Sequence, residues 1–213
     1  MGTIWAGRIL AVGVLSVHLT LAGCAPRTET ESPPPAEAVA VTLHQYVADN
    51  GIAETPVRRG DPGTPTVKFA APPGWRNAGN RTPDWAYGAI IYDAPKNSAD
   101  PPYMIAIASK LTGDIDVAKV LEYAPGQLNG LPDFAARGKP TTSSLGGHQA
   151  VDYVGTFLGG GETKSIGQVT IAVPGGPGEV FVYQLNAVAP PGEEQVVIDA
   201  VKRITTDTRI TPP

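Results

Sequence analysis

Hydrophobic and polar residues beyond position 40 follow patterns that predict helices separated by strands. Leu43, Tyr46 and Val47 recur with the spacing of one helical face. Residues 42–45 (Thr-Leu-His-Gln) have the Thr-x-x-Gln spacing of a capping box, and Asn50-Gly51 supplies a stop. The sequence therefore predicts a short helix at the start of this region.

Six later runs have the composition of strands. They are Thr66–Ala70, Ala86–Asp93, Tyr103–Ser109, Gln149–Leu158, Ser165–Val173 and Glu179–Ala189. The second and third runs are apolar on both faces, which is typical of central strands. The last three are joined by the short glycine-rich segments 159–161 and 174–178. Short links of this kind indicate antiparallel hairpins.

Two further helices are predicted from apolar stripes with helical spacing. One follows Asp114, whose carboxylate is placed to cap the first turn, and Pro125-Gly126 should kink or end it. The other lies near residues 193–204, where Glu193 and Glu194 suit the first turn. The two stripes consist of Val117, Val120, Leu121 and Ala124, and of Val196, Val197, Ala200, Val201 and Ile204. This order of elements predicts an α+β domain, an antiparallel β-sheet flanked by helices.

Composition narrows the functional class. The chain has 213 residues, a formal net charge of −4 and a single cysteine. The acidic balance argues against nucleic acid as a partner, since such proteins normally carry a basic face. One cysteine excludes an internal disulfide and a thiol-only metal site. The 25 glycines and 22 prolines favour many turns and a tether over a helical bundle.

The N-terminus has the features of a secretory signal. Arg8 precedes an apolar run, Ile9–Gly23, which is shorter than the roughly 20 residues of a membrane-spanning helix. The run ends in Leu-Ala-Gly-Cys at residues 21–24, which resembles the lipobox of bacterial lipoproteins, and the chain's only cysteine occupies it. We therefore expect residues 1–23 to be a lipoprotein signal peptide and Cys24 to carry acyl chains such as palmitate.

The expected mature chain has two parts. Residues 24–40 are polar and Pro-rich, and Pro33-Pro34-Pro35 favours extended geometry, so this segment is interpreted as a tether. Residues 41–213 have the pattern of a single domain. Acyl chains on Cys24 would hold this domain at a membrane without crossing it. The expected location is the extracytoplasmic face of the cell membrane.

Several of these features together resemble the LpqN/LpqT-type lipoproteins of mycobacteria. The resemblance covers roughly residues 41–206. It rests on the lipobox, the tether, the first helix, Pro72–Trp75 (PPGW), Lys110–Leu121 (KLTGDIDVAKVL) and the terminal helix. It implies a fold similar to the Mog1p/PsbP-like α/β/α sandwich and an envelope protein that binds or helps to traffic lipids and glycolipids. The resemblance supplies no catalytic residues.

The sequence offers little for catalysis. Ser143 or Ser144 with His148 and Asp152 contains the residue types of a nucleophilic triad, but no Gly-x-Ser-x-Gly elbow is present. Residues 141–147 are interpreted instead as a polar loop before a strand. We therefore expect a protein that is not an enzyme.

Metal and phosphate sites are also poorly supported. A zinc site would have only His44 and His148 to draw on, and His44 is expected in solvent. Asp114 and Asp116 resemble the start of a calcium loop that does not continue. The two glycine-rich links precede strands, whereas a phosphate loop precedes a helix. No metal and no cofactor are expected.

Aromatic residues give a better lead to a binding site. Trp75, Trp85, Tyr87, Tyr92 and Tyr103 fall in one third of the chain, near turns. Aromatic rings with polar groups suit sugar faces and lipid interfaces, although some of these residues would serve the core. We expect Trp75, Trp85, Tyr87 and Tyr103 to mark a groove for a lipid or glycolipid.

Three hypotheses of function follow. The leading one is a non-enzymatic, lipid-anchored protein that binds an envelope lipid, a glycolipid or an envelope protein. The second is a surface module that docks to other proteins and has no small-molecule pocket. The third is a serine hydrolase using Ser143 or Ser144 with His148. A cavity near Trp85 and Tyr103 would favour the first, an exposed apolar patch the second, and a Ser–His contact the third.

Overall fold

The computed structural model of the protein describes residues 41–213. The predicted signal peptide, Cys24 and the tether lie outside the described residues. All described helices and strands fall within one compact unit, Ala38–Pro213.

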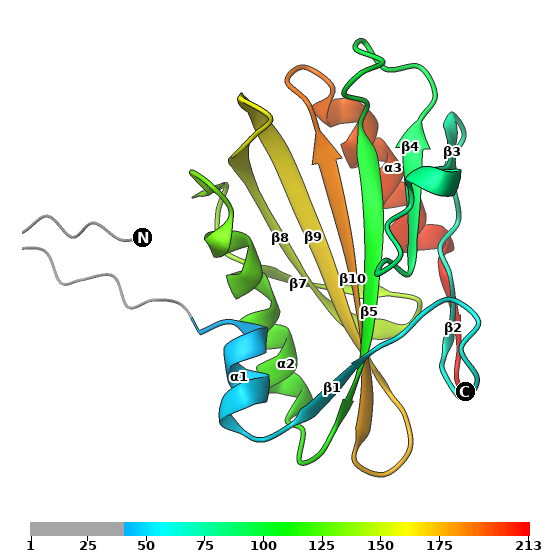
Figure 1. Ribbon diagram of the computed structural model, residues 1–213, viewed down its shortest axis with the longest axis vertical. Helices are drawn as coiled ribbons and strands as arrows, with labels where there is room; N and C mark the ends of the chain where they lie inside the picture. The colour runs from blue at the N-terminus through cyan, green and yellow to red at the C-terminus, as the bar shows by residue number, and fades with distance from the viewer. Residues whose placement is uncertain (1–40) are drawn as a thin grey trace, which may run out of the picture. The chain divides into compact units, whose positions relative to one another are not determined.

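A nine-stranded antiparallel sheet forms the centre of this unit (Figure 1). Its order is β3-β4-β5-β10-β9-β8-β6, while β1 pairs with β5 and β7 pairs with β8. The strands are β1 (Ala53–Pro56), β3 (Trp75–Asn77), β4 (Gly88–Tyr92), β5 (Tyr103–Thr112), β6 (Ala135–Ala136), β7 (Thr141–Leu145), β8 (His148–Gly159), β9 (Glu162–Pro174) and β10 (Glu179–Ala189). A separate two-stranded sheet pairs β2 (Thr66–Lys68) with β11 (Arg209–Thr211).

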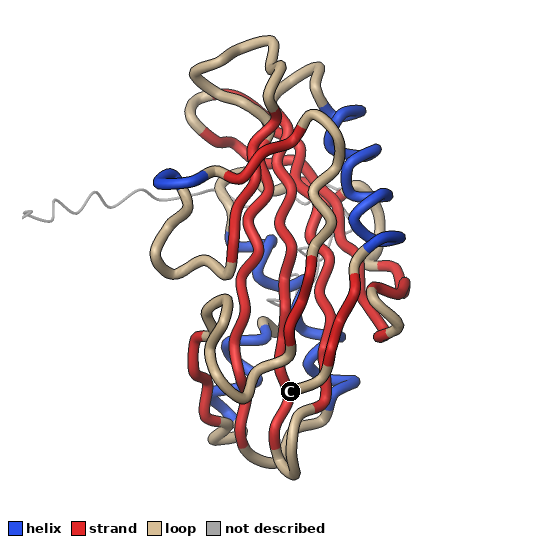
Figure 2. The backbone as a smooth tube through the Cα atoms, turned by 90° about the vertical axis from the view of Figure 1, so that its right-hand side faces the viewer, coloured by secondary structure: helices blue, strands red, loops and turns tan. Residues whose placement is uncertain are grey.

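Helices cover both faces of the large sheet. The first face carries α1 (Leu43–Asp49) and α2 (Val117–Tyr123), and the 3₁₀ helix η2 (Ala124–Gly130) continues α2. The other face carries α3 (Glu194–Asp207), which lies behind the sheet in Figure 1 and beside the strands in Figure 2. A further 3₁₀ turn, η1, spans Gly79–Arg81. The arrangement confirms the predicted α+β class and has three layers.

Each face has its own apolar core, and the alternation along β10 explains why. Phe181, Tyr183 and Leu185 point to the α3 face, where they pack with Ile204 of that helix. Val180 and Val182 point to the opposite face and pack against α1 and α2. A strand buried on both sides has an almost continuous apolar sequence. The expectation that the two apolar runs at 86–93 and 103–109 are inner strands is confirmed, since β4 and β5 each have neighbours on both sides.

Two glycine pairs set the register of the hairpins. Gly160 and Gly161 both have positive φ (66° and 85°) and link β8 to β9. Gly146 and Gly147 also have positive φ (59° and 86°) and link β7 to β8. A two-residue hairpin loop of this type needs positive φ at both positions, which glycine adopts without strain.

The first helix is confirmed, and the second begins later than predicted. Thr42 caps α1 by accepting the Gln45 N–H at 3.1 Å. Asp114 was expected to cap α2, but it is exposed, and Asp116 is the cap, accepting the N–H groups of Ala118 (2.8 Å) and Lys119 (3.3 Å). Extended backbone up to Asp116 lets the intervening Ile115 pack against the α1–α2 core before the helix begins.

The expectation of a loop at Ser143 and Ser144 is wrong, because both lie in strand β7. Only Leu145 of that strand is buried, so an edge strand with polar residues shows no apolar alternation. The short strands β1, β3, β6 and β11 were also missed, because strands of two to four residues are too short to show an alternation. The end of α2 is as predicted: the α-helix stops at Tyr123 and residues 124–130 continue as η2.

Candidate functional site

A groove lies between α3 and strands β8 and β9. Its volume is about 240 Å³, and most of its wall is apolar. We call it the α3 groove. The sheet contributes Val154, Val169, Ala187 and Ala189, and the helix contributes Val197, Ile198 and Val201. Val154 and Ile198 are 45% and 44% exposed, so apolar side chains at the groove face solvent.

Small residues in the sheet create this groove. Val154, Gly167 and Ala187 are cross-strand neighbours on the α3 face, and Ser165 pairs with Ala189 in the next row. A Cβ added at Gly167 would meet nothing closer than the Val154 side chain at 3.9 Å. The sheet therefore leaves a gap under α3, because β9 and β10 place small residues beside this helix.

Charged side chains of both signs surround the apolar floor. Arg137 and Lys202 provide cations, and Asp152 and Glu194 provide carboxylates. Among the described residues, Asp152 Oδ1 is buried and has no hydrogen-bond partner. Burial raises the pKa of Asp152, and the Ser143 hydroxyl, which lies nearby without hydrogen-bond geometry, partly offsets this.

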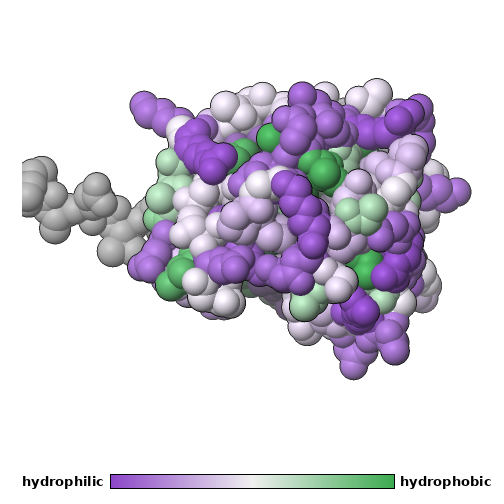
Figure 3. Space-filling view, turned by 90° about the horizontal axis from the view of Figure 1, so that it is seen from above, coloured by the Kyte–Doolittle hydropathy of each residue, from purple (hydrophilic) through white to green (hydrophobic). Residues whose placement is uncertain are grey.

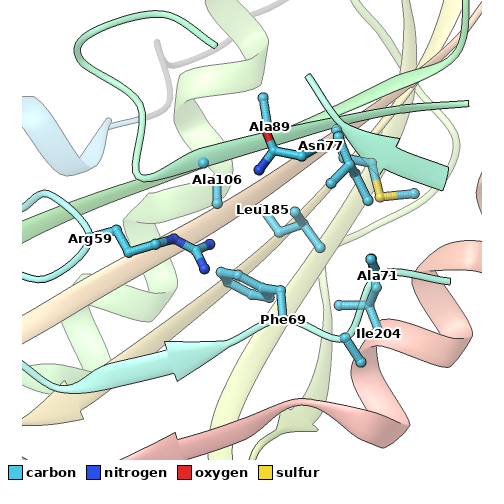
Figure 4. Close-up of a pocket in the computed structure, with 12 residues that line it drawn as sticks. Arg59, Phe69, Ala71, Asn77, Ala89, Ala106, Leu185 and Ile204 are labelled. Atoms are coloured by element: carbon cyan, nitrogen blue, oxygen red, sulfur yellow. The ribbon is translucent and has the colours of Figure 1, made fainter. Parts of the chain in front are cut away.

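A second cavity, of about 200 Å³, lies on the same face of the sheet but on the β4–β5 side of α3 (Figure 4). We call it the Arg59 pocket. Gly88, Ala106 and Leu185 form one cross-strand row of its wall, and Ile204 of α3 closes it. Glycine and alanine in that row leave the space that the cavity occupies.

The four predicted aromatic residues do not converge on one groove. Tyr87 is buried beside the Arg59 pocket, and the Arg59 guanidinium lies over its ring, 5.2 Å from the ring centroid. Trp75 is buried and packs on Tyr92, with ring centroids 5.5 Å apart. Trp85 is 55% exposed. None of Trp75, Trp85 and Tyr87 lines either cavity.

Tyr103 lies on the opposite face of the sheet. Its cross-strand neighbour is Val188, and both pack in the apolar cluster around Leu128. Burial raises the pKa of Tyr103, while nearby Lys164 acts in the opposite direction. Ligand binding by the four aromatic residues stays a prediction, and the structure gives them separate surroundings.

The residues proposed for a hydrolase do not form a nucleophilic site. Ser144 is exposed and Ser143 Oγ is buried without a hydrogen-bond partner. Among the described residues, no hydrogen bond joins either serine to His148. A nucleophile would need its base within about 2.6–3.2 Å.

Metal-ligating residues are dispersed in the same way. His44 is exposed, as predicted, and His148 is half-buried on β8. The part of the chain that the structure describes contains no group of three or more His, Cys, Asp or Glu that could hold a metal. The Asp114–Asp116 pair belongs to the approach and cap of α2.

Sequence reasoning missed three residues that shape the cavities. Ile198 lies outside the predicted apolar face of the last helix, and Val154 breaks the alternation of its strand. Both are apolar residues at positions where the helical or strand periodicity predicts polar ones, and this departure could have indicated an exposed apolar surface. Arg59 gave no signal, because its importance comes from the distant Tyr87.

Among the described residues, the other large exposed apolar side chains are Val41, Trp85 and Leu158. On the end of the molecule seen from above, hydrophobic residues are scattered singly among hydrophilic ones (Figure 3). Single exposed apolar residues are normal on a protein surface, whereas contiguous ones mark contact sites. The α3 groove, which has two exposed apolar residues over an apolar floor, is therefore the stronger candidate.

Comparison with known proteins identifies similar chains. A family model described as "Probable lipoprotein LpqN" matches residues 39–211. The chain is 38% identical over 226 residues to lipoprotein LpqN of Mycobacterium tuberculosis, covering 95% of this chain and 97% of that protein. A crystal structure of LpqN, "involved in cell envelope biogenesis of Mycobacterium tuberculosis", is 44% identical with a TM-score of 0.74. The match covers 80% of this chain and 98% of the solved chain, so the solved chain has little beyond the matched part.

Proposed function

Because the chain belongs to the LpqN lipoprotein family, we propose that it is a lipid-anchored envelope protein that binds an envelope lipid or glycolipid without catalysing a reaction. The LpqN of known structure is described as involved in cell envelope biogenesis, which supports this location and role. The α3 groove is the proposed binding site, and the observation that carries the proposal is its open apolar floor.

The groove suits the junction between an acyl chain and a hydroxyl-rich head group. Val154, Val169 and Ile198 offer apolar surface to a hydrocarbon chain. Asp152 and Glu194 can accept hydrogen bonds from hydroxyl groups, and Lys202 can donate them. Charges of both signs around the rim give no preference for a charged head group, so a neutral glycolipid fits better than an anionic lipid.

Anchoring is the second part of the proposal. None of the helices in residues 41–213 is long and apolar enough to cross a bilayer. Cys24 is the proposed attachment point for acyl chains, on the extracytoplasmic face of the cell membrane. A tether of residues 24–40 would keep the domain at high local concentration against membrane lipids, so weak binding would be sufficient.

Lipid retention tests the groove directly. A soluble form beginning at Ala38 would be mixed with envelope lipid extract and examined by native mass spectrometry. Gly167→Val places a side chain in open space on the groove floor and suits a strand, so the fold should be retained. Gly130→Val is the matched control, because a Cβ there meets nothing within 4 Å. We expect lipid adducts on wild type and on the control, and few on Gly167→Val.

Two outcomes would oppose the proposal. Equal lipid retention by Gly167→Val would exclude the α3 groove as the site, and no retention by wild type would exclude lipid binding by this domain. The anchor is tested separately with Cys24→Ala, which should lose metabolic labelling by an acyl chain. Continued labelling of this variant would exclude Cys24 as the attachment point.

Docking to a protein is the second candidate function. A volume of about 240 Å³ falls below the range of about 300–1,000 Å³ that is usual for small-molecule pockets. A groove of this size also fits one or two apolar side chains of a protein partner. Wild type that retains no lipid, together with loss of a co-purifying envelope protein in Gly167→Val, would favour this function.

A further inference from the structure

Among the described residues, Arg59 is a cation without a counterion. Its guanidinium lies over the Tyr87 ring, and in the part of the chain that the structure describes its side chain forms no ion pair or hydrogen bond. The neighbouring Arg58, in contrast, donates to the Asp84 carbonyl at 2.6 Å. Arg59 therefore has its five donor hydrogens available for a ligand.

The space in front of this guanidinium is apolar. Figure 4 shows the Arg59 guanidinium beside Phe69, and Leu185 and Ile204 are among the other residues that line the pocket. Met104, Ala106, Leu185 and Ile204 are all at most 5% exposed. Asn77 is the one other polar side chain among the described residues that line the pocket, and no acidic residue lines it.

The exposed residue Arg59 places its guanidinium beside Tyr87 and Gly88. The Tyr87 hydroxyl accepts the Val67 N–H at 3.3 Å, and the Tyr87 ring packs edge-on against Tyr183 with centroids 5.3 Å apart. A Cβ added at Gly88 would lie 3.0 Å from the Arg59 guanidinium. The Tyr87 ring therefore offers a packed surface for the guanidinium, and glycine at position 88 leaves room for it.

From these contacts we propose that the Arg59 pocket binds an aliphatic carboxylate, with the carboxylate on Arg59 and the chain inside. Guanidinium and carboxylate are matched planar groups that form paired hydrogen bonds. The apolar wall excludes a ligand that is polar throughout, and the absence of an acidic lining residue gives a cationic ligand no partner. A volume of about 200 Å³ limits the enclosed part to a short chain or the first part of a longer one. This site is separate from the α3 groove and takes a ligand of different charge.

Octanoate is the probe, and 1-octanol is its neutral counterpart. The soluble form beginning at Ala38 would be titrated with each, followed by calorimetry and by amide chemical shifts. We expect octanoate to bind, to shift the amides of Gly88 and Ala106, and to bind at least about tenfold more tightly than octanol, since a hydrogen-bonded charge pair is worth about 1.5 kcal/mol or more. Binding should weaken as salt concentration rises.

Variants separate the charge from the cavity. Arg59→Gln should weaken octanoate binding about tenfold and leave octanol unchanged, because only the charged contact is lost. Arg81→Gln is the matched control, an exposed arginine on η1 away from the pocket, and should behave as wild type. Ala71→Leu fills the mouth from an exposed position and should weaken both probes. Gly167→Val should leave octanoate binding intact, so failure of the α3 groove and failure of this site are distinguishable.

The proposal fails under any of three results. Equal affinity of wild type and Arg59→Gln for octanoate would exclude Arg59 as the carboxylate partner. Equal affinity for octanoate and octanol would indicate an apolar cavity without charge recognition. Competition by inorganic phosphate at the same affinity as octanoate would indicate a surface anion site that does not use the cavity.

Discussion

Asp116 is the cap of α2, and its replacement by alanine tests how that helix begins. Asp116 accepts two first-turn N–H groups, from Ala118 at 2.8 Å and Lys119 at 3.3 Å. Alanine removes Oδ1, the acceptor of both hydrogen bonds, but keeps the backbone N–H that Asp116 donates to the Tyr46 hydroxyl. The perturbation is therefore confined to the cap.

The expected cost follows from these contacts. Loss of an N-cap costs about 0.5–2 kcal/mol, and typically about 1 kcal/mol. Asp116 is exposed, so water can replace part of the hydrogen bonding that the carboxylate provides. We therefore expect the free energy of unfolding to fall by about 1 kcal/mol. For a domain of this size that free energy corresponds to a fall in Tm of about 2–4 °C.

Urea unfolding followed by tryptophan fluorescence measures this difference. Asp116→Asn keeps an oxygen acceptor and should lie close to wild type, which separates hydrogen bonding from charge. Asp114→Ala is the matched control, since the exposed Asp114 side chain forms no hydrogen bond in the described part of the chain. Unfolding midpoints that fall equally for Asp114→Ala and Asp116→Ala, or for neither, would refute the reasoning.

Three further predictions concern stability. Tyr183→Phe removes a buried hydrogen bond of 2.9 Å to a carbonyl and should cost about 1–3 kcal/mol in urea unfolding with an unchanged m value. Burial raises the pKa of Asp152, so the carboxyl binds its proton more tightly in the native state than in the unfolded state. The stability of wild type therefore falls as pH rises from 3.8 through the native pKa. Asp152→Asn should be more stable than wild type at pH 7, and this gain should vanish below pH 3.8. Asp100→Asn removes the counterion of the Lys164 ammonium, which lies 2.6 Å from Asp100 and is 11% exposed, and should lower the free energy of unfolding by about 1–3 kcal/mol. Asp93→Asn is the control: it breaks the exposed ion pair with Arg76 and should change the free energy of unfolding by less than about 0.5 kcal/mol.

The elements with apolar periodicity were predictable from sequence, and polar edge strands were not. The long strands β8, β9 and β10 and all three helices carry their pattern locally, because burial dictates every second or every third to fourth residue. Strand β7 exposes most of its side chains, so its pairing with β8 comes from the Gly146-Gly147 turn and not from hydrophobicity.

The candidate site was harder to predict because its two cavities lie where the strands carry glycine and alanine instead of larger side chains. Ligand binding by the aromatic residues stays a prediction; of the four, Tyr87 lies beside the Arg59 pocket, with its ring centroid 5.2 Å from the Arg59 guanidinium. Sequence spacing, however, gives no account of Gly167 lying beside Val154 and Ala187, since three strands must pair in register to bring them together. Cavities of this kind become visible only once the register is known.

The order of the strands also determines how late in synthesis the central sheet can form. β5 and β10 are neighbours over ten residue pairs, yet residues 113–178 separate them in the chain. Pairing over such a separation requires a large loop to close, which slows folding. During synthesis β5 thus has only the short strands β1 and β4 as partners until β10 has been made. A chain built in this order cannot complete its central sheet until most of the polypeptide has been synthesised.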